Sequence, residues 1–134
     1  MGGGIWFHTL PIRVSGLTGV TAIAGGFSTA YALLGDGSVR AWGLGEKGQL
    51  GNGANEDSLS PLPVSGLTGV TAIAGGTANG YALLGDRTVM AWGAGAAGAL
   101  GNGAIDDSPL PVAVSGLTGA TAITGGFSAA YAIH

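Results

Sequence analysis

The two histidines, His8 and His134, are the first candidates for chemistry, because imidazole binds metals and exchanges protons near neutral pH. They occupy places where the repeated part of the chain has Ser58, Ser108 and Leu84. In the strand arrangement expected below, the two imidazoles are about 15 Å apart, the length of a five-residue strand. A shared metal would therefore need another strand register or a second chain. The alternative is a pair of surface histidines near the termini.

Two pairs of adjacent carboxylates, Glu56-Asp57 and Asp106-Asp107, recur 50 residues apart. Paired carboxylates can hold a hard cation or act as base for a bound water. Combined with His8 across a junction between two chains, they would form a hydrolytic site. A divalent metal is the one cofactor that these residues suggest. The alternative is that Asp57 and Asp107 accept backbone N–H bonds inside a turn, as Asp before Ser commonly does.

The composition excludes two classes of partner. The chain has 134 residues, 8% of them charged, and a formal net charge of −3, with its four cationic side chains scattered along the sequence. Because nucleic acids and anionic membranes require clustered Lys and Arg, we expect neither as a partner. Glycine interrupts every apolar run and no signal peptide is recognisable, so we expect a soluble protein. The absence of cysteine leaves the compartment open.

The sequence is built from a repeat of 50 residues. The phrase VSGLTGVTAIAGG begins at Val14 and at Val64, and it returns nearly unchanged at Val114. This period divides the chain into a unique start (1–13), a first repeat (14–63), a second repeat (64–113) and a C-terminal half repeat (114–134). A strand-rich repeat of this length is typical of a β-propeller blade.

Each repeat predicts four strands. In the first repeat these are Val20–Ala24, Ala30–Leu34, Ser38–Trp42 and Leu62–Val64, and the second repeat has copies of all four. The turn Gly35-Asp36-Gly37 is a strong hairpin signal. Four antiparallel strands per repeat are what a propeller blade requires, so the predicted fold class is all-β.

The repeat also carries a motif. Trp42-Gly43 is followed by Gly48-Gln49-Leu50-Gly51, and the second copy has Trp92-Gly93 with Ala99 in the place of Gln49. This pattern resembles the regulator-of-chromosome-condensation repeat. The resemblance implies a β-propeller, seven-bladed in the best-known members, whereas this chain holds two whole repeats and parts of others. Trp42 and Trp92 are expected to pack between blades.

The two ends are complementary halves of one blade. The half repeat ends at His134 and so carries only the first two strands, while Leu10-Pro11-Ile12 aligns with the fourth. Gly4–Phe7 is the candidate third strand, with Trp6 in the place of the repeat tryptophan. Each chain then holds three blades, and head-to-tail association would close a ring and cover the sheet edges. A cyclic dimer is favoured over a trimer. The alternative is that the unique start is a disordered or vector-derived tail.

The predicted function is a binding or scaffold module that assembles into a closed ring. The residues expected to contact a partner are Lys47, Gln49, Glu56, Asp57, Asp106 and Asp107. One alternative is a metal-dependent hydrolase whose site lies between subunits and uses His8, His134 and the loop carboxylates. The other is a designed or fragment propeller without activity.

Overall fold

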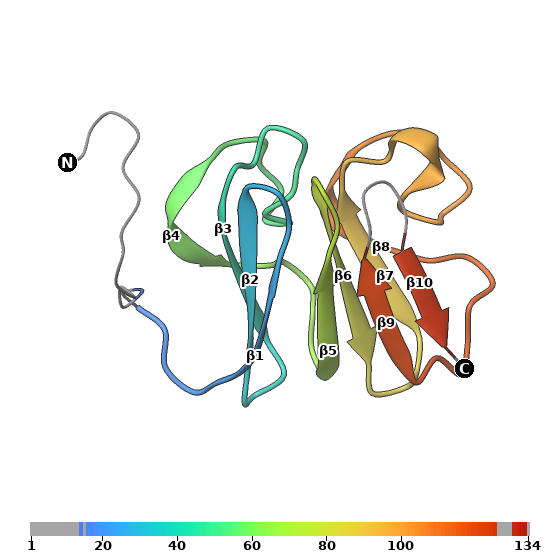
Figure 1. Ribbon diagram of the computed structural model, residues 1–134, viewed down its shortest axis with the longest axis horizontal. Coiled ribbons are helices and arrows are strands. Elements are labelled where there is room, and N and C mark those ends of the chain that lie inside the picture. Colours follow the sequence, from blue (N-terminus) through green and yellow to red (C-terminus); the bar gives the residue numbers. More distant parts are fainter. Residues whose placement is uncertain (1–13, 15, 126–129, 134) are drawn as a thin grey trace.

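Each full repeat folds into one four-stranded antiparallel sheet, and the half repeat contributes a hairpin (Figure 1). The computed structural model describes residue 14, residues 16–125 and residues 130–133. The first sheet contains β1 (Val20–Gly25), β2 (Thr29–Leu34), β3 (Val39–Gly43) and β4 (Ser58–Pro63). The second contains β5 (Val70–Gly75), β6 (Asn79–Leu84), β7 (Val89–Gly93) and β8 (Ser108–Ala113), with the 3-10 turn η1 (Ala96–Gly98) in its long loop. The hairpin pairs β9 (Ala122–Gly125) with β10 (Ala130–Ile133).

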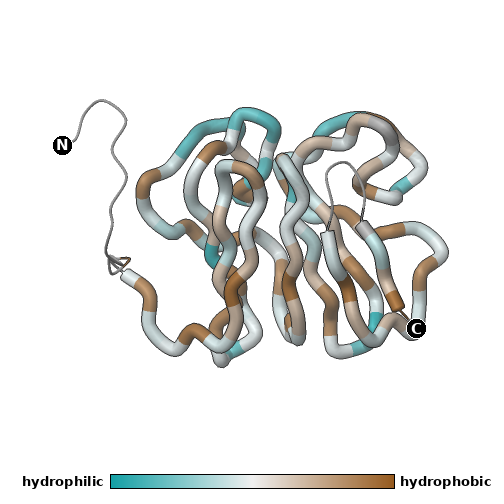
Figure 2. Tube along the Cα trace, in the orientation of Figure 1, coloured by the Kyte–Doolittle hydropathy of each residue, from teal (hydrophilic) through white to brown (hydrophobic). Residues whose placement is uncertain are grey.

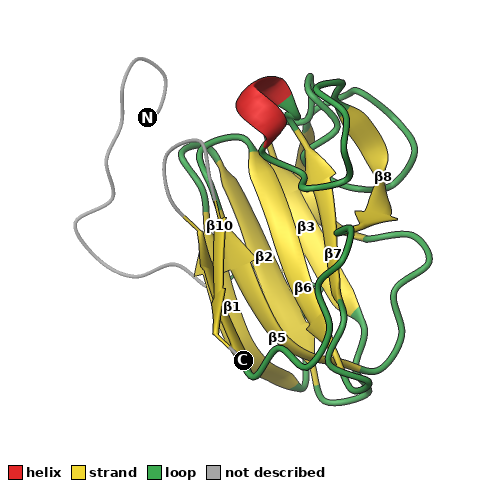
Figure 3. Cartoon of the chain, turned by 90° about the vertical axis from the view of Figure 1, so that its right-hand side faces the viewer, coloured by secondary structure: helices red, strands yellow, loops and turns green. Residues whose placement is uncertain are grey.

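The three sheets stack face to face, as the blades of a propeller do (Figures 1 and 3). Tyr31 and Val39 of the first sheet share one apolar cluster with Trp92 of the second. On the other face of the second sheet, Ile123 of the hairpin packs against a cluster that contains Leu83. The prediction of an all-β fold made of four-stranded propeller blades is therefore confirmed. No helix in the described ranges is long and apolar enough to cross a lipid bilayer.

The fourth strand begins earlier than the sequence predicts. We expected it at Leu62–Val64, but β4 starts at Ser58, which pairs with Gly43 across an irregular register. The strand contains Pro61 and Pro63, which made it look like a loop. Because β4 lies at the outer edge of its sheet, it can contain residues that have no N–H to donate. The same holds for β8 in the second repeat. The predicted strands at Gly4–Phe7 and Leu10–Ile12 lie outside the described residues.

The turn between the second and third strands differs between the repeats at one position. Gly37 has φ 82° in the first repeat, and Arg87 has φ 69° in the second. Their N–H groups donate to Leu34 and Leu84, so the two turns have the same hydrogen bond. A residue with a Cβ is strained in this left-handed region by about 1 kcal/mol. We therefore expect Arg87→Gly to raise the free energy of unfolding by up to about 1 kcal/mol, measured by urea denaturation.

The matched variant at the first turn should have the opposite effect. A Cβ on Gly37 would lie 3.1 Å from the backbone nitrogen of Gly69, which belongs to the segment leading into β5. Gly37→Ala should therefore lower the free energy of unfolding by more than about 1 kcal/mol, because contact adds to strain. A loss of stability in Arg87→Gly would mean that the Arg87 side chain stabilises the second turn by more than the strain costs.

Candidate functional site

The two long loops, residues 44–57 and 94–107, leave the same end of the two blades (Figure 1), and hydrophilic residues concentrate there (Figure 2). Together these loops contain five carboxylates and one ammonium group, which is a net charge of −4. We call this surface the loop end. Lys47, Glu56 and Asp106 are exposed on it. Most of the acidity of the chain therefore lies at one end of the blades.

Asp57 and Asp107 brace these loops. The Gly45 N–H donates to Asp57 Oδ1 at 2.9 Å, and the Gly95 N–H donates to Asp107 Oδ1 at 3.0 Å. Each bond joins the first residues of a loop to its last, across 12 positions. The two aspartates thus accept backbone N–H groups, as in the alternative to metal binding, but they do so across the whole loop and not inside a turn. Glu56 and Asp106, the preceding residues, have no such bond among the described residues. Together with the exposed Glu46, they are the carboxylates that remain available to a partner.

Gln49 is buried and accepts hydrogen bonds from other parts of the chain. Its side chain is only 5% exposed, and its Oε1 accepts the Lys47 N–H at 2.7 Å. Its carbonyl oxygen accepts the Tyr31 hydroxyl at 2.8 Å and the Trp92 indole N–H at 2.9 Å. This burial removes the Gln49 side chain from the surface that we expected to contact a partner. Lys47 remains exposed beside it.

The Gln49 carbonyl is the centre of a joint between the two blades. Tyr31 donates to it from its own blade and Trp92 from the next, and the two rings meet edge to face with centroids 5.6 Å apart. Trp92 is fully buried, whereas Trp42 is half-buried. Burial raises the pKa of the Tyr31 hydroxyl well above its ordinary value, so this group remains a donor. The packing role of Trp92 was predicted, but the carbonyl acceptor was not.

The second repeat carries the same arrangement on its other side. The Tyr81 hydroxyl donates to the Ala99 carbonyl at 2.8 Å, and burial raises the pKa of Tyr81 to about 12. No third tryptophan reaches this carbonyl within the described ranges. As a result Gly101 is exposed, whereas Gly51 in the first repeat is buried against Trp92. This side of the second blade is thus half of a joint.

The hydrolytic site that we considered is not assembled by the described residues. His8 and His134 both lie outside the described residues. In the part of the chain that the structure does describe, no group of three His, Cys, Asp or Glu side chains is placed to hold a metal ion. Two of the loop carboxylates, Asp57 and Asp107, are already bonded to backbone N–H groups.

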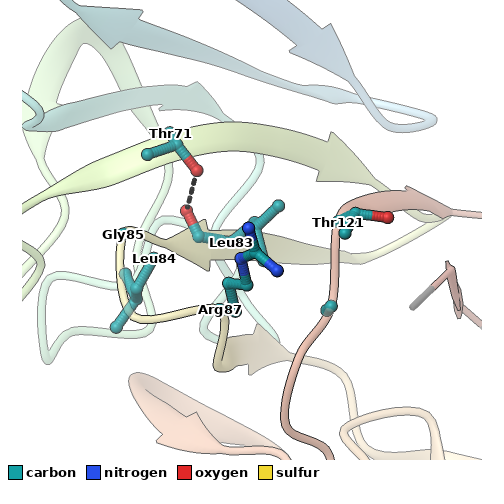
Figure 4. Close-up of a pocket in the computed structure, with 7 residues that line it drawn as sticks. Thr71, Leu83, Leu84, Gly85, Arg87 and Thr121 are labelled. Atoms are coloured by element: carbon teal, nitrogen blue, oxygen red, sulfur yellow. Dashed lines mark hydrogen bonds between the residues drawn. The ribbon is translucent and has the colours of Figure 1, made fainter.

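A hollow of about 240 Å³ lies at the opposite end of the second blade (Figure 4). It is lined in part by Thr71, Arg87 and Thr121. Both threonine hydroxyls already donate, to the carbonyls of Leu83 and Ile133. None of the residues singled out from the sequence lines this hollow. Its described lining offers one cationic side chain, Arg87, and no carboxylate or imidazole.

One position at the start of the second strands yields a further stability prediction. The Thr29 hydroxyl donates to the Leu44 carbonyl, and in the second repeat the Asn79 amide donates to the Ala94 carbonyl. Asn79 Oδ1 is buried without a hydrogen-bond partner among the described residues. We expect Asn79→Thr to raise the free energy of unfolding by about 1 kcal/mol, because it removes this buried acceptor. Thr29→Asn should lower it, and a stabilised Thr29→Asn protein would contradict this explanation.

The repeated sequence is similar to repeats of known proteins. The family described as "Regulator of chromosome condensation (RCC1) repeat" matches residues 36–83, and a second RCC1 repeat family matches residues 20–49. RCC1 repeats are thus identified over residues 20–83 of the chain. It is 43% identical over 61 residues to the human protein "Regulator of chromosome condensation", and the mouse protein of that name gives the same identity. These matches cover 46% of this chain and 14% of each relative.

Solved structures share the fold of the chain. Human WBSCR16 superposes with a TM-score of 0.80 at 27% identity, over 90% of this chain and 32% of its own. Prp20p from Saccharomyces cerevisiae superposes with a TM-score of 0.76 at 18% identity, over 92% of this chain and 32% of its own. The chain therefore spans about a third of the length of these two proteins. At 18% identity the likeness to Prp20p supports the fold alone.

Proposed function

We propose that this RCC1 chain is a scaffold module that completes a propeller with copies of itself and presents its loop end to a partner. The observation that supports assembly most strongly is the half joint formed by Tyr81, Ala99 and Gly101. The same groups in the first repeat, Tyr31, Gln49 and Gly51, are covered by the next blade. A neighbouring blade would cover the half joint in the same way.

The hairpin adds a second reason to expect assembly. It has two strands where each full blade has four, so β10 is an edge strand among the described residues. Tyr131 and Ile133 on β10 are 64% and 66% exposed, whereas Tyr31 and Tyr81 at the position of Tyr131 are each 1% exposed. Exposed apolar edge strands favour pairing with another chain. In a cyclic dimer, each chain would cover the β10 edge of the other, so neither β10 edge would stay exposed.

Sedimentation of the purified chain tests the assembly. We expect a discrete dimer that dissociates on dilution, because head-to-tail junctions can close in pairs. A trimer would still support head-to-tail association but would mean a larger ring. A folded monomer at all concentrations would overturn the proposed assembly, and polymers of indefinite length would show that the junctions do not close.

The loop end is the surface that we propose for a partner. Glu56 and Asp106 are exposed on this surface, and its net charge of −4 favours a cationic partner. Yeast Prp20p has binding properties toward Gsp1p and histones, but its 18% identity carries neither partner over to this chain. The nature of the partner is therefore argued from charge alone.

A cationic probe tests this surface. A lysine decapeptide should bind the wild-type chain, and binding should weaken as salt screens the charges. The double variant Glu56→Lys and Asp106→Lys should abolish this binding. Asp86→Lys, at the opposite end of the blade, should retain it. Equal binding by both variants would exclude the loop end as the partner surface.

A further inference from the structure

The joint between the two blades is made by three backbone features of the first long loop. The Gln49 carbonyl accepts the Trp92 indole N–H at 2.9 Å. The Gly53 N–H donates to the Pro109 carbonyl at 2.9 Å. Gly51 leaves room for the indole, since a Cβ on it would lie 3.0 Å from Trp92 Cδ1. An indole and a fourth-strand carbonyl from the next blade thus seat on this loop.

The second long loop has all three features without the partner. The Ala99 carbonyl accepts only the Tyr81 hydroxyl among the described residues, and the Gly103 N–H has no backbone acceptor there. The three atoms nearest to a Cβ on Gly101 all belong to Val114. Gly101 nevertheless keeps φ at 64°, close to the 65° of Gly51. The slot is formed in advance of any occupant.

The hairpin defines what can enter this slot. β9 and β10 pair in the way that β1 pairs with β2, so they occupy the places of a first and second strand. In the full blades, the tryptophan of the third strand lies opposite Ala30 or Gly80 of the second. A third strand added along β10 would place its tryptophan opposite Ala130, beside the second long loop. The vacant places are therefore those of a third and a fourth strand.

The sequence offers one segment that fits these places. The chain has three tryptophans, and Trp42 and Trp92 already lie in β3 and β7. Trp6 is the remaining one, and it is followed by Leu10-Pro11-Ile12, which aligns with Leu110-Pro111-Val112 of β8. This alignment places Thr9 at the position of Pro109, whose carbonyl accepts the Gly53 N–H.

We propose that Ala99, Gly101 and Gly103 form an indole-binding slot that receives residues 4–12 of a second copy of this chain. The Trp6 indole N–H donates to the Ala99 carbonyl, and the Thr9 carbonyl accepts the Gly103 N–H. This inference rests on the proposed self-assembly and identifies the groups that produce it. An indole is selected because the slot combines a buried acceptor with a space that a glycine keeps open.

Two variants and one control test the slot. Trp6→Phe keeps an aromatic ring and removes the N–H donor. Gly101→Ala adds the one atom that an indole would meet. Gly66→Ala is the control, because Gly66 has a similar φ of 72° and no atom within 4 Å of an added Cβ. By sedimentation of the full chain, we expect the first two variants to weaken self-association by about tenfold or more. The control should associate as the wild-type chain does.

Mixing the two variants tests whether Trp6 and the slot are the two sides of one junction. The Trp6→Phe chain keeps an intact slot, and the Gly101→Ala chain keeps an intact Trp6. An equimolar mixture should therefore associate more tightly than either variant alone, through one native junction. A wild-type chain that stays monomeric would overturn the proposed assembly itself. A wild-type dimer that neither Trp6→Phe nor Gly101→Ala weakens would overturn the slot and leave the assembly standing.

Discussion

Trp92→Ala is expected to be strongly destabilising. Trp92 is fully buried between the blades, its indole N–H donates to the Gln49 carbonyl, and its ring contacts Tyr31. Truncating a buried aromatic side chain usually costs about 3–5 kcal/mol, and here a hydrogen bond to a buried carbonyl is lost as well. Urea denaturation should show the two blades unfolding at much lower denaturant concentration, or only partly folded in water.

Trp42→Ala is the matched control for this prediction. Trp42 occupies the same position in the first repeat, but it is half-buried and its indole makes no hydrogen bond among the described residues. Its removal should cost less than half as much as that of Trp92, measured at concentrations where the chain is monomeric. Equal losses for the two variants would contradict the claim that the joint, rather than the blade itself, is what a repeat tryptophan stabilises.

Gly51→Ala is expected to have a large effect as well. Gly51 has φ 65°, and an added Cβ would lie 2.7 Å from Val64 Cγ1 and 3.1 Å from Trp92 Nε1. Backbone strain of about 1 kcal/mol therefore adds to the cost of overpacking, about 1–3 kcal/mol. The Trp92 indole would have to move away from the Gln49 carbonyl. The free energy of unfolding should decrease, and the tryptophan emission maximum should move to longer wavelength as the Trp92 indole becomes exposed.

The second repeat again supplies the control. Gly101 has φ 64°, but the nearest atoms to an added Cβ are those of Val114, the first at 3.0 Å. In the monomeric chain, Gly101→Ala should therefore lower stability mainly through backbone strain, and it should leave tryptophan fluorescence unchanged. If it shifted the fluorescence as Gly51→Ala does, a tryptophan would already occupy the second slot within the same chain.

Most of the fold could be predicted because the same strand and turn pattern occurs in both full repeats. Trp42 and Trp92 recur 50 residues apart beside glycine-rich loops, and apolar strands alternate with turns at the same spacing. The start of β4 was missed because its prolines are typical of loops, and only its place at the sheet edge explains them.

The joint itself was harder to predict, because its acceptor is a backbone carbonyl. Every residue has a backbone carbonyl, so the residue type at position 49 does not indicate an acceptor. We therefore considered only the Gln49 side chain and assigned it to a partner surface. The replacement by Ala99 looked like a departure from the motif, yet Ala99 presents the same carbonyl to Tyr81. For Asp57 and Asp107, binding to backbone N–H groups was among the alternatives, because an Asp before a Ser commonly accepts such bonds in a turn. The sequence did not indicate that the donors would be Gly45 and Gly95, 12 residues away.

Native mass spectrometry of the purified chain, recorded with and without a chelator, tests the central claim most directly. It reports subunit number and any bound divalent metal in one experiment. We predict a closed dimer, dissociating when Trp6→Phe or Gly101→Ala removes one side of the junction, with a mass that the chelator does not change. A folded monomer would contradict the proposed ring, and a dimer that loses stoichiometric metal and falls apart with the chelator would show that a metal site, rather than the indole slot, joins the two chains.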